Sequence, residues 1–195
     1  YAGERLNYDA NTLAVFSETT RLFHEHRFEV DSEITIFRTE EDKIYPDLLN
    51  PQTTQAFLSL AHESYAKRLS VLSQYGVQMI FTDEPAIGFP YWSEILHGEF
   101  QKRFGYDLLD YLPQLLSGED GGIVREQYFD TMSWLFAQNY FLPIKKWCKE
   151  HGVLLTGHLD KDNDIYDSVR SHGQIMRLLR CFDVPGIDVI WRQIF

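Results

Sequence analysis

A short apolar run that ends in two carboxylates and a proline constrains this chain more than any other segment. Val77 to Phe81 is β-prone and follows Gly76, and Pro85 cannot donate to a strand ladder, so the run predicts a buried strand that ends at Asp83 and Glu84. In β/α folds catalytic groups gather at the carboxyl ends of the strands, because the sheet fixes the bases of loops that are free to vary. We therefore expect Glu84 to lie at the edge of a sheet where an active site forms.

Apolar runs further along the chain repeat this pattern. The segment 153–156 leads into Gly157 and His158, and the segment 184–190 enters a further strand through Pro185 and Gly186. Helical patterns separate the strands, over 51–75 behind an Asn50-Pro51 cap, 92–104, 108–116, 125–151 with a break or bend at Pro143, and 174–182. This alternation predicts an α/β fold with a parallel sheet and covering helices.

The first 44 residues have a different pattern. Polarity alternates from Arg27 to Phe37 with Ile34 and Ile36 on the apolar face, which predicts a half-buried strand or hairpin. The apolar residues at 13–23 fit neither the spacing of a helix nor that of a strand. We expect residues 1–44 to be a β-rich segment or an insertion. A closed eightfold β/α barrel takes about 250 residues, so we expect residues 45–195 to form part of a (β/α)8 TIM-type barrel.

Composition excludes several classes of partner. The formal net charge is −11, with 18 Lys and Arg against 29 Asp and Glu and no basic cluster, so we expect no nucleic-acid partner. No apolar run approaches the roughly 20 residues that span a bilayer, and no leader is visible, so we expect a soluble, cytoplasmic protein without a membrane partner. Cys148 and Cys181 are expected to be buried thiols in a reducing compartment, and Tyr1 in place of Met suggests a piece of a longer protein.

Five groups of residues occur in an order that is informative as a set. They are Asp47-Leu48-Leu49-Asn50-Pro51, His62-Glu63-Ser64-Tyr65, Phe81-Thr82-Asp83-Glu84-Pro85, Phe104-Gly105-Tyr106-Asp107 with Leu112-Pro113, and Gly157-His158. From about Tyr45 to Ile190 the chain thereby resembles large bacterial glycoside hydrolases related to the α-L-rhamnosidases of family 106. The resemblance implies a (β/α)8 catalytic barrel that hydrolyses glycosidic bonds of plant or microbial poly- and oligosaccharides, with Glu84 as general acid and the remainder of the barrel as partner.

The chemistry of glycoside hydrolysis suits Glu84. One carboxyl group protonates the leaving oxygen and a second activates water or attacks the sugar. Partial desolvation and the adjacent charge of Asp83 both favour the protonated form of Glu84. Successive strand side chains point to opposite faces, so Asp83 is expected to orient the loop or bind substrate rather than to be the second carboxylate. Asp160 and Asp188 are available for that role, but the resemblance supports neither, and a solvated Asp83-Glu84 pair at a helix start is the non-catalytic interpretation.

Other polar and aromatic residues are candidates for substrate binding. His158 follows a strand and could contact a sugar hydroxyl or hold a carboxylate, although a histidine bonded to backbone is equally expected. Tyr91 and Trp92 follow the acidic strand end and Trp191 follows the last strand, and flat rings of this kind stack on sugars, with burial in a core as the alternative.

The spacing of Asp160, Asp162 and Asp164 is like the start of a calcium loop. Ile165 and Ser171 stand where an EF-hand needs Gly and Glu, so we expect a solvated acidic loop and assign no metal ligand. We expect no cofactor, and the resemblance leaves calcium at the barrel mouth as an open alternative, because rhamnosidase relatives can use it.

The sequence leaves two other functions open. One is a barrel remnant that binds carbohydrate without turnover. The other is a metal-dependent hydrolase that uses His158, Asp83 and the Asp160 loop.

Overall fold

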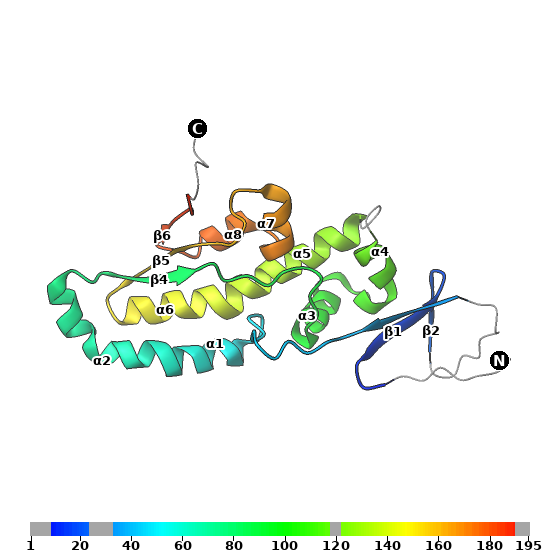
Figure 1. The fold of residues 1–195 in the computed structure, drawn as a ribbon, viewed down its shortest axis with the longest axis horizontal. Helices are drawn as coiled ribbons and strands as arrows, with labels where there is room; N and C mark the ends of the chain where they lie inside the picture. The colour runs from blue at the N-terminus through cyan, green and yellow to red at the C-terminus, as the bar shows by residue number, and fades with distance from the viewer. Residues whose placement is uncertain (1–8, 24–32, 118–121, 190–195) are drawn as a thin grey trace.

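A computed structural model describes residues 9–23, 33–117 and 122–189 and shows a mixed α/β molecule that is elongated, with a small antiparallel sheet at one end and helix α2 at the other (Figure 1). The antiparallel sheet has the order β2-β1-β3 and consists of β1 (Thr12–Ser17), β2 (Thr20–Leu22) and β3 (Ile34–Arg38). The stretch that fits neither period in the sequence is thus a pair of strands.

The alternation in β3 was assigned to the wrong face. Phe37 lies opposite Ala14 and packs edge-to-face on Phe16 with ring centroids 5.6 Å apart, so it contributes to the buried side. Ile36 lies opposite Val15 on the other face and is 40% exposed. Residues 27–32 of the predicted strand lie outside the described part of the chain.

The helix predicted after Asn50 is confirmed. The Asn50 side chain accepts a hydrogen bond from the Gln52 amide and begins α1 (Pro51–Phe57). A π-helical turn (Leu58–His62) joins α1 to α2 (Glu63–Leu72), and a 3-10 turn (Ser73–Tyr75) follows. Gly76 ends the helix with φ 87°, in the left-handed region that glycine tolerates best.

A second sheet is parallel, as the alternation predicts. Its order is β4-β5-β6, and it consists of β4 (Met79–Asp83), β5 (Leu154–His158) and β6 (Val184–Pro185). The register places Thr82 opposite Gly157 and Asp83 opposite His158, so two polar strand ends lie side by side. The third strand lies at the start of the segment 184–190 that is predicted to enter it, and the Gly186 amide continues the pairing by donating to the Gly157 carbonyl at 2.8 Å.

Helices connect these strands. They are α3 (Glu94–Phe104), a 3-10 turn (Leu108–Tyr111), α4 (Leu112–Leu116), α5 (Gly122–Phe136), a π-helical turn (Ala137–Phe141), α6 (Leu142–Glu150), α7 (Ile165–His172) and α8 (Ile175–Leu179). Pro143 lies in the first turn of α6, where its missing amide costs little, and the helix continues into it through the π turn. Helix α7 replaces part of the predicted acidic loop, because the Asp164 side chain accepts the Asp167 amide and caps it.

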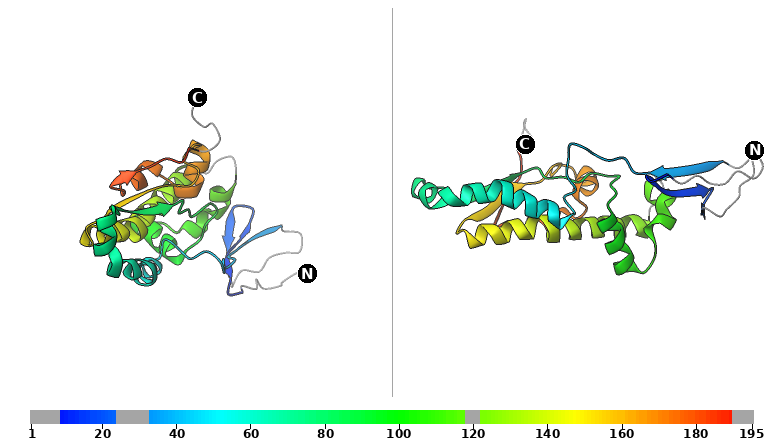
Figure 2. Two further views of the ribbon diagram at one scale, coloured as in Figure 1. Left: turned by 60° about the vertical axis from the view of Figure 1, so that its left-hand side comes forward. Right: turned by 90° about the horizontal axis from the view of Figure 1, so that it is seen from below.

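The long α5–α6 helix contacts both α1 and β5 and so forms the middle of the core (Figures 1 and 2). Fully buried side chains on it include Met132, Phe136, Phe141 and Ile144. The opposite face of the parallel sheet is uncovered by the described residues, where Phe81 is 59% exposed. The described strands form an open sheet and not a closed barrel. Within the described ranges, no helix combines the length and apolar character needed to cross a membrane.

Candidate functional site

The carboxyl edge of the parallel sheet brings Asp83, Glu84 and His158 together. The His158 Nε2 atom lies 3.1 Å from Asp83 Oδ1, and its Nδ1 atom lies 3.9 Å from Glu84 Oε1. The side chain of His158 is 12% exposed, whereas those of Asp83 and Glu84 are 76% and 46% exposed. A mostly buried imidazole therefore lies between two carboxylates that face solvent.

The backbone at Glu84 explains how two successive residues reach one histidine. Glu84 has φ 45°, in the left-handed region that is uncommon for a side chain other than glycine. The chain leaves the strand direction at this point, so the strict alternation that places Asp83 and Glu84 on opposite faces ends. The sequence carries no local signal for this turn, since Pro85 predicts only that the strand ends.

Asp188 joins the same edge from the segment after β6. A carboxylate oxygen of Glu84, a ring nitrogen of His158 and a carboxylate oxygen of Asp188 all lie within 4.8 Å of one another. The backbone of Asp188 is held in place because its amide donates to Asp162 Oδ2 at 2.9 Å. The sequence shows that Asp188 is an available carboxylate but gives it no role. Its position depends on the hydrogen bond to Asp162, which lies far from it in the sequence, in the segment after β5.

The two ring nitrogens of His158 differ in their contacts. Asp83 lies at Nε2 and Glu84 lies at Nδ1, so a carboxylate faces each ring nitrogen of His158. Nδ1 is buried and makes no hydrogen bond to another described residue. This nitrogen is a candidate ligand atom for a cation.

The three clustered residues also form a donor set for a metal. Two carboxylates and an imidazole are ligands that zinc accepts, whereas calcium takes six to eight oxygen atoms and would need several further donors. Ligand atoms around tetrahedral zinc lie about 3.4 Å apart, so a bound ion would draw these atoms closer together. The described residues therefore offer part of a cation site, in which Asp188 and Glu84 take the places predicted for Asp83 and the Asp160 loop.

The acidic segment after β5 has mainly structural contacts. Asp160 pairs with the neighbouring Lys161 at 3.4 Å, Asp162 holds the Asp188 amide and Asp164 caps α7. Beneath this segment His172 is completely buried, with Nδ1 at 3.0 Å from the Ser168 carbonyl and Nε2 without a hydrogen-bond partner in the described residues. Burial lowers the pKa of His172, while the Ser168 carbonyl and the charges of Asp160 and Asp162 act in the opposite direction.

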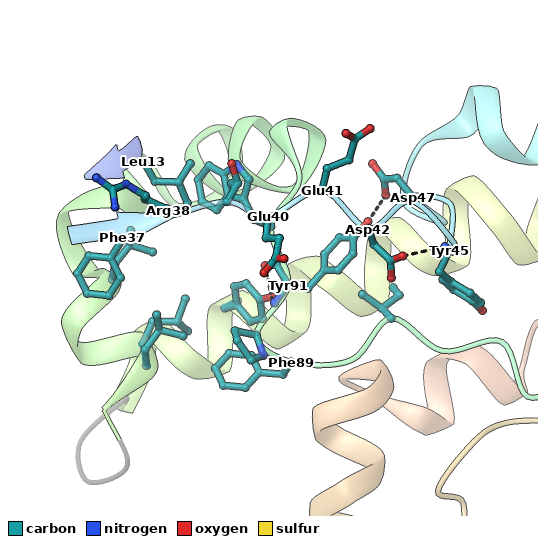
Figure 3. Close-up of a pocket in the computed structure, with 18 of the residues that line it drawn as sticks. Leu13, Phe37, Arg38, Glu40, Glu41, Asp42, Tyr45, Asp47, Phe89 and Tyr91 are labelled. Atoms are coloured by element: carbon teal, nitrogen blue, oxygen red, sulfur yellow. Dashed lines mark hydrogen bonds between the residues drawn. The ribbon is translucent and has the colours of Figure 1, made fainter. Parts of the chain in front are cut away.

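Tyr91 and Trp92 lie in a separate pocket of about 770 Å³ (Figure 3). It lies between β1 and β3, the connector 39–47, the loop after Pro85, and helices α4 and α5. The Tyr91 hydroxyl donates to Asp47 at 2.5 Å, and burial raises the pKa of this tyrosine. The Trp92 indole nitrogen lies 3.4 Å from Glu94. Neither residue joins the Glu84 cluster, and Trp191 lies outside the described residues.

Comparison with known proteins gives one informative result. The sequence matches no protein family and no curated protein. Among solved structures, the rhamnosidase from Novosphingobium sp. PP1Y aligns with a TM-score of 0.53 and 17% sequence identity, over 82% of this chain and 14% of that chain. The likeness is one of fold. The chain spans about a seventh of the rhamnosidase's length.

Proposed function

We propose that the chain is the acid-carrying part of a glycoside hydrolase that acts on plant or microbial poly- and oligosaccharides. The observation that carries this proposal is the convergence of Glu84, His158 and Asp188 at the carboxyl edge of a parallel sheet. This edge is where β/α enzymes hold their reacting groups. The rhamnosidase-like fold supports glycosidic bonds, α-L-rhamnosides first among them, as the substrate class.

In this proposal Glu84 protonates the oxygen of the leaving group as the glycosidic bond breaks, while a second carboxylate, which the further β/α units would supply, activates water or itself attacks the anomeric carbon. Its side chain is about half exposed and so can reach a bound sugar, while His158 lies beside it at 3.9 Å. Asp83 fixes the orientation of the histidine ring from the other side. His158 and Asp83 then act as positioning residues that also offer hydrogen bonds to sugar hydroxyls.

The uncovered face of the parallel sheet supports further β/α units as the partner of this region. Met79, Phe81, Leu154 and Val184 on that face are each between 40% and 59% exposed. Apolar side chains in a parallel sheet are normally buried on both faces, so a partial TIM-type barrel needs neighbouring strands over them. A barrel remnant that binds carbohydrate without turnover would keep the sheet but would not depend on Glu84.

The test is hydrolysis of a panel of aryl glycosides, α-L-rhamnoside included, by the full-length protein and by its Glu84→Gln variant. We expect turnover by the parent, a loss of at least roughly 100-fold in the variant, and unchanged sugar binding. Glu150→Gln on the exposed last turn of α6 is the matched control and should keep full activity. Oligosaccharide binding without turnover of any substrate by the parent would favour the non-catalytic interpretation.

A cation-dependent hydrolase is the second candidate, favoured specifically by the buried Nδ1 atom of His158, which accepts or donates no hydrogen bond within the described residues and belongs to the three-donor cluster. We expect calorimetric titration of zinc and of calcium into metal-free protein to show which ion, if either, binds. His158→Ala and Asp188→Ala should each abolish that binding, whereas Asp160→Ala should not. Binding that survives all three changes would place the ion elsewhere.

A further inference from the structure

The pocket that holds Tyr91 and Trp92 is large enough for a ligand and is built mostly from rings and aliphatic side chains. Its volume of about 770 Å³ lies within the range of roughly 300 to 1,000 Å³ that is usual for small-molecule sites. The aromatic residues that line it are Phe37, Tyr45, Phe89, Tyr91, Trp92 and Tyr128. Leu112, Leu115 and Leu116 of α4 supply aliphatic surface. The walls therefore offer flat apolar faces to an occupant.

Polar groups deep in the pocket are already satisfied by the protein. The Tyr128 hydroxyl donates to the Tyr91 carbonyl at 2.6 Å and accepts the Tyr91 amide at 3.2 Å. Asp47 accepts from the Tyr91 hydroxyl and, at 2.9 Å, from Ser93 Oγ. Tyr128 is only 1% exposed, so an occupant would meet the partly exposed rings of Tyr91 and Trp92 rather than that of Tyr128.

Glu40 supplies a free acceptor at the rim. Its side chain points into the pocket toward Tyr91, whereas that of the neighbouring Glu41 points away (Figure 3). Glu40 makes no hydrogen bond or ion pair with another described residue. Arg38, the cation among the lining residues, is paired with Asp9 at 3.3 Å. The rim is therefore negatively charged, which opposes an anionic occupant.

The loop from Glu84 to Tyr91 connects the Glu84 cluster to this pocket. The chain from Glu84 to Tyr91 spans at most about 25 Å even when fully extended. Its middle is anchored, because the amides of Ile87 and Gly88 donate to the Ser171 carbonyl at 3.1 and 3.2 Å. Ile87, Phe89 and Tyr91 on this loop line the pocket. The pocket therefore lies no more than about 25 Å from Glu84, a span that an extended oligosaccharide of several units covers.

We propose that this pocket is a second carbohydrate-binding site, which takes the remote units of a neutral oligosaccharide and rejects uronic acids. The proposal rests on the proposed glycosidase function for the identity of the ligand. Ring faces stack on the C–H faces of sugars, and Glu40 accepts hydrogen bonds from their hydroxyls. The same carboxylate repels a sugar that carries its own carboxylate.

The test is calorimetric binding of a neutral tetrasaccharide of α-L-rhamnose to the full-length protein and to single variants, all in the Glu84→Gln background so that no hydrolysis occurs. Glu40→Ala and Trp92→Ala should each weaken binding about tenfold. Glu41→Ala is the matched control, since this residue lies next to Glu40 but faces outward, and it should bind like the parent. A tetrasaccharide with alternating uronic acid units should bind at least about tenfold more weakly than the neutral one.

Unchanged affinity in both Glu40→Ala and Trp92→Ala would overturn the proposal, as would equal affinity for the acidic oligosaccharide. Glu40 is exposed and unpartnered, so its replacement keeps the test valid if Trp92→Ala unfolds. With Glu84 restored, turnover of a single-sugar aryl rhamnoside should be the same in the pocket variants and the parent. Absent turnover combined with pocket-dependent binding would refute the glycosidase and not the pocket.

Discussion

At the scale of single residues, Gly157 shows how tightly the site edge is built. It has φ 148°, and a Cβ atom at this position would lie 2.1 Å from the carbonyl oxygen of Thr82 on the neighbouring strand. A side chain here would push β4 and β5 apart beside Asp83 and His158. The glycine is thus required by the close approach of two backbones.

We predict that Gly157→Ala lowers the free energy of unfolding by about 3 kcal/mol, because the strands must separate or the backbone must strain. Urea unfolding followed by circular dichroism measures this change. Gly98→Ala within α3 is the control, since nothing lies within 4 Å of its added Cβ, and it should stabilise by about 0.5–1 kcal/mol. Equal stability of the two variants would contradict the close packing of the strands.

His172 gives a prediction about pH. Burial lowers its pKa in the folded state, so the unfolded chain binds a proton at higher pH than the folded one. The stability that depends on neutral His172 is then fully present above the unfolded pKa of about 6.5 and is lost as pH falls through the lower folded pKa. We expect the Tm to fall between pH 7 and pH 5, and to fall less in His172→Gln. Burial shifts the pKa of His62 in the same direction, so part of the pH dependence should remain.

The positions of site residues were predictable from the sequence where one short segment determines them. The position of Glu84 at a strand end follows from an apolar run and a proline in one short segment. Asp188 could not be assigned, because its place depends on β6 pairing with β5 and on the contact with Asp162. The sequence around residue 188 contains no local pattern that predicts either interaction.

At the scale of elements, Asp130 on α5 connects three helices. It forms ion pairs with Arg103 of α3 and, at 2.6 Å, with Arg177 of α8, and Gln174 before α8 donates to the same carboxylate at 2.8 Å. The Asp130 side chain is 20% exposed, so these contacts are only partly screened by solvent.

We predict that Asp130→Ala lowers the free energy of unfolding by about 2 kcal/mol, since it leaves two partly buried arginines without their carboxylate. A double-mutant cycle with Arg177→Ala, measured by urea unfolding, isolates that pair. A coupling energy of at least about 0.5 kcal/mol is expected, and additive effects would show that the two side chains act independently.

Helix boundaries were predictable where caps are encoded locally. Asn50, Gly76 and Gly105 begin or end helices at the residues expected. Helix α7 was missed because its short acidic start reads as a loop, and only the pairing of Asp164 with the Asp167 amide shows that it is a cap. The β3 face was misassigned because the period alone does not say which side the core occupies.

At the scale of the whole molecule, the parallel sheet with covering helices was predictable from alternation, but the face that the helices cover and barrel closure were not. Closure depends on how many strands pair around an axis, and that is not a property of any local segment. The open face of β4, β5 and β6 is therefore the feature that most affects solution behaviour.

We predict that the 195-residue chain, purified by itself, associates through this face. Phe81→Glu should shift the sedimentation profile toward the monomer, because the side chain is 59% exposed at the centre of the face. Tyr75→Glu is the control, with an 81% exposed ring in the turn after α2, and it should leave association unchanged. A monomeric parent at high concentration would contradict this prediction.

A comparison of leaving groups in Glu84→Gln tests whether Glu84 donates a proton to the leaving group. The full-length variant should lose roughly 100- to 10,000-fold in kcat on alkyl rhamnosides, whose leaving oxygen needs a proton. On a dinitrophenyl rhamnoside, whose leaving group departs without one, the loss should be less than about tenfold. Equal losses on both substrates would contradict the assignment of Glu84 as the general acid.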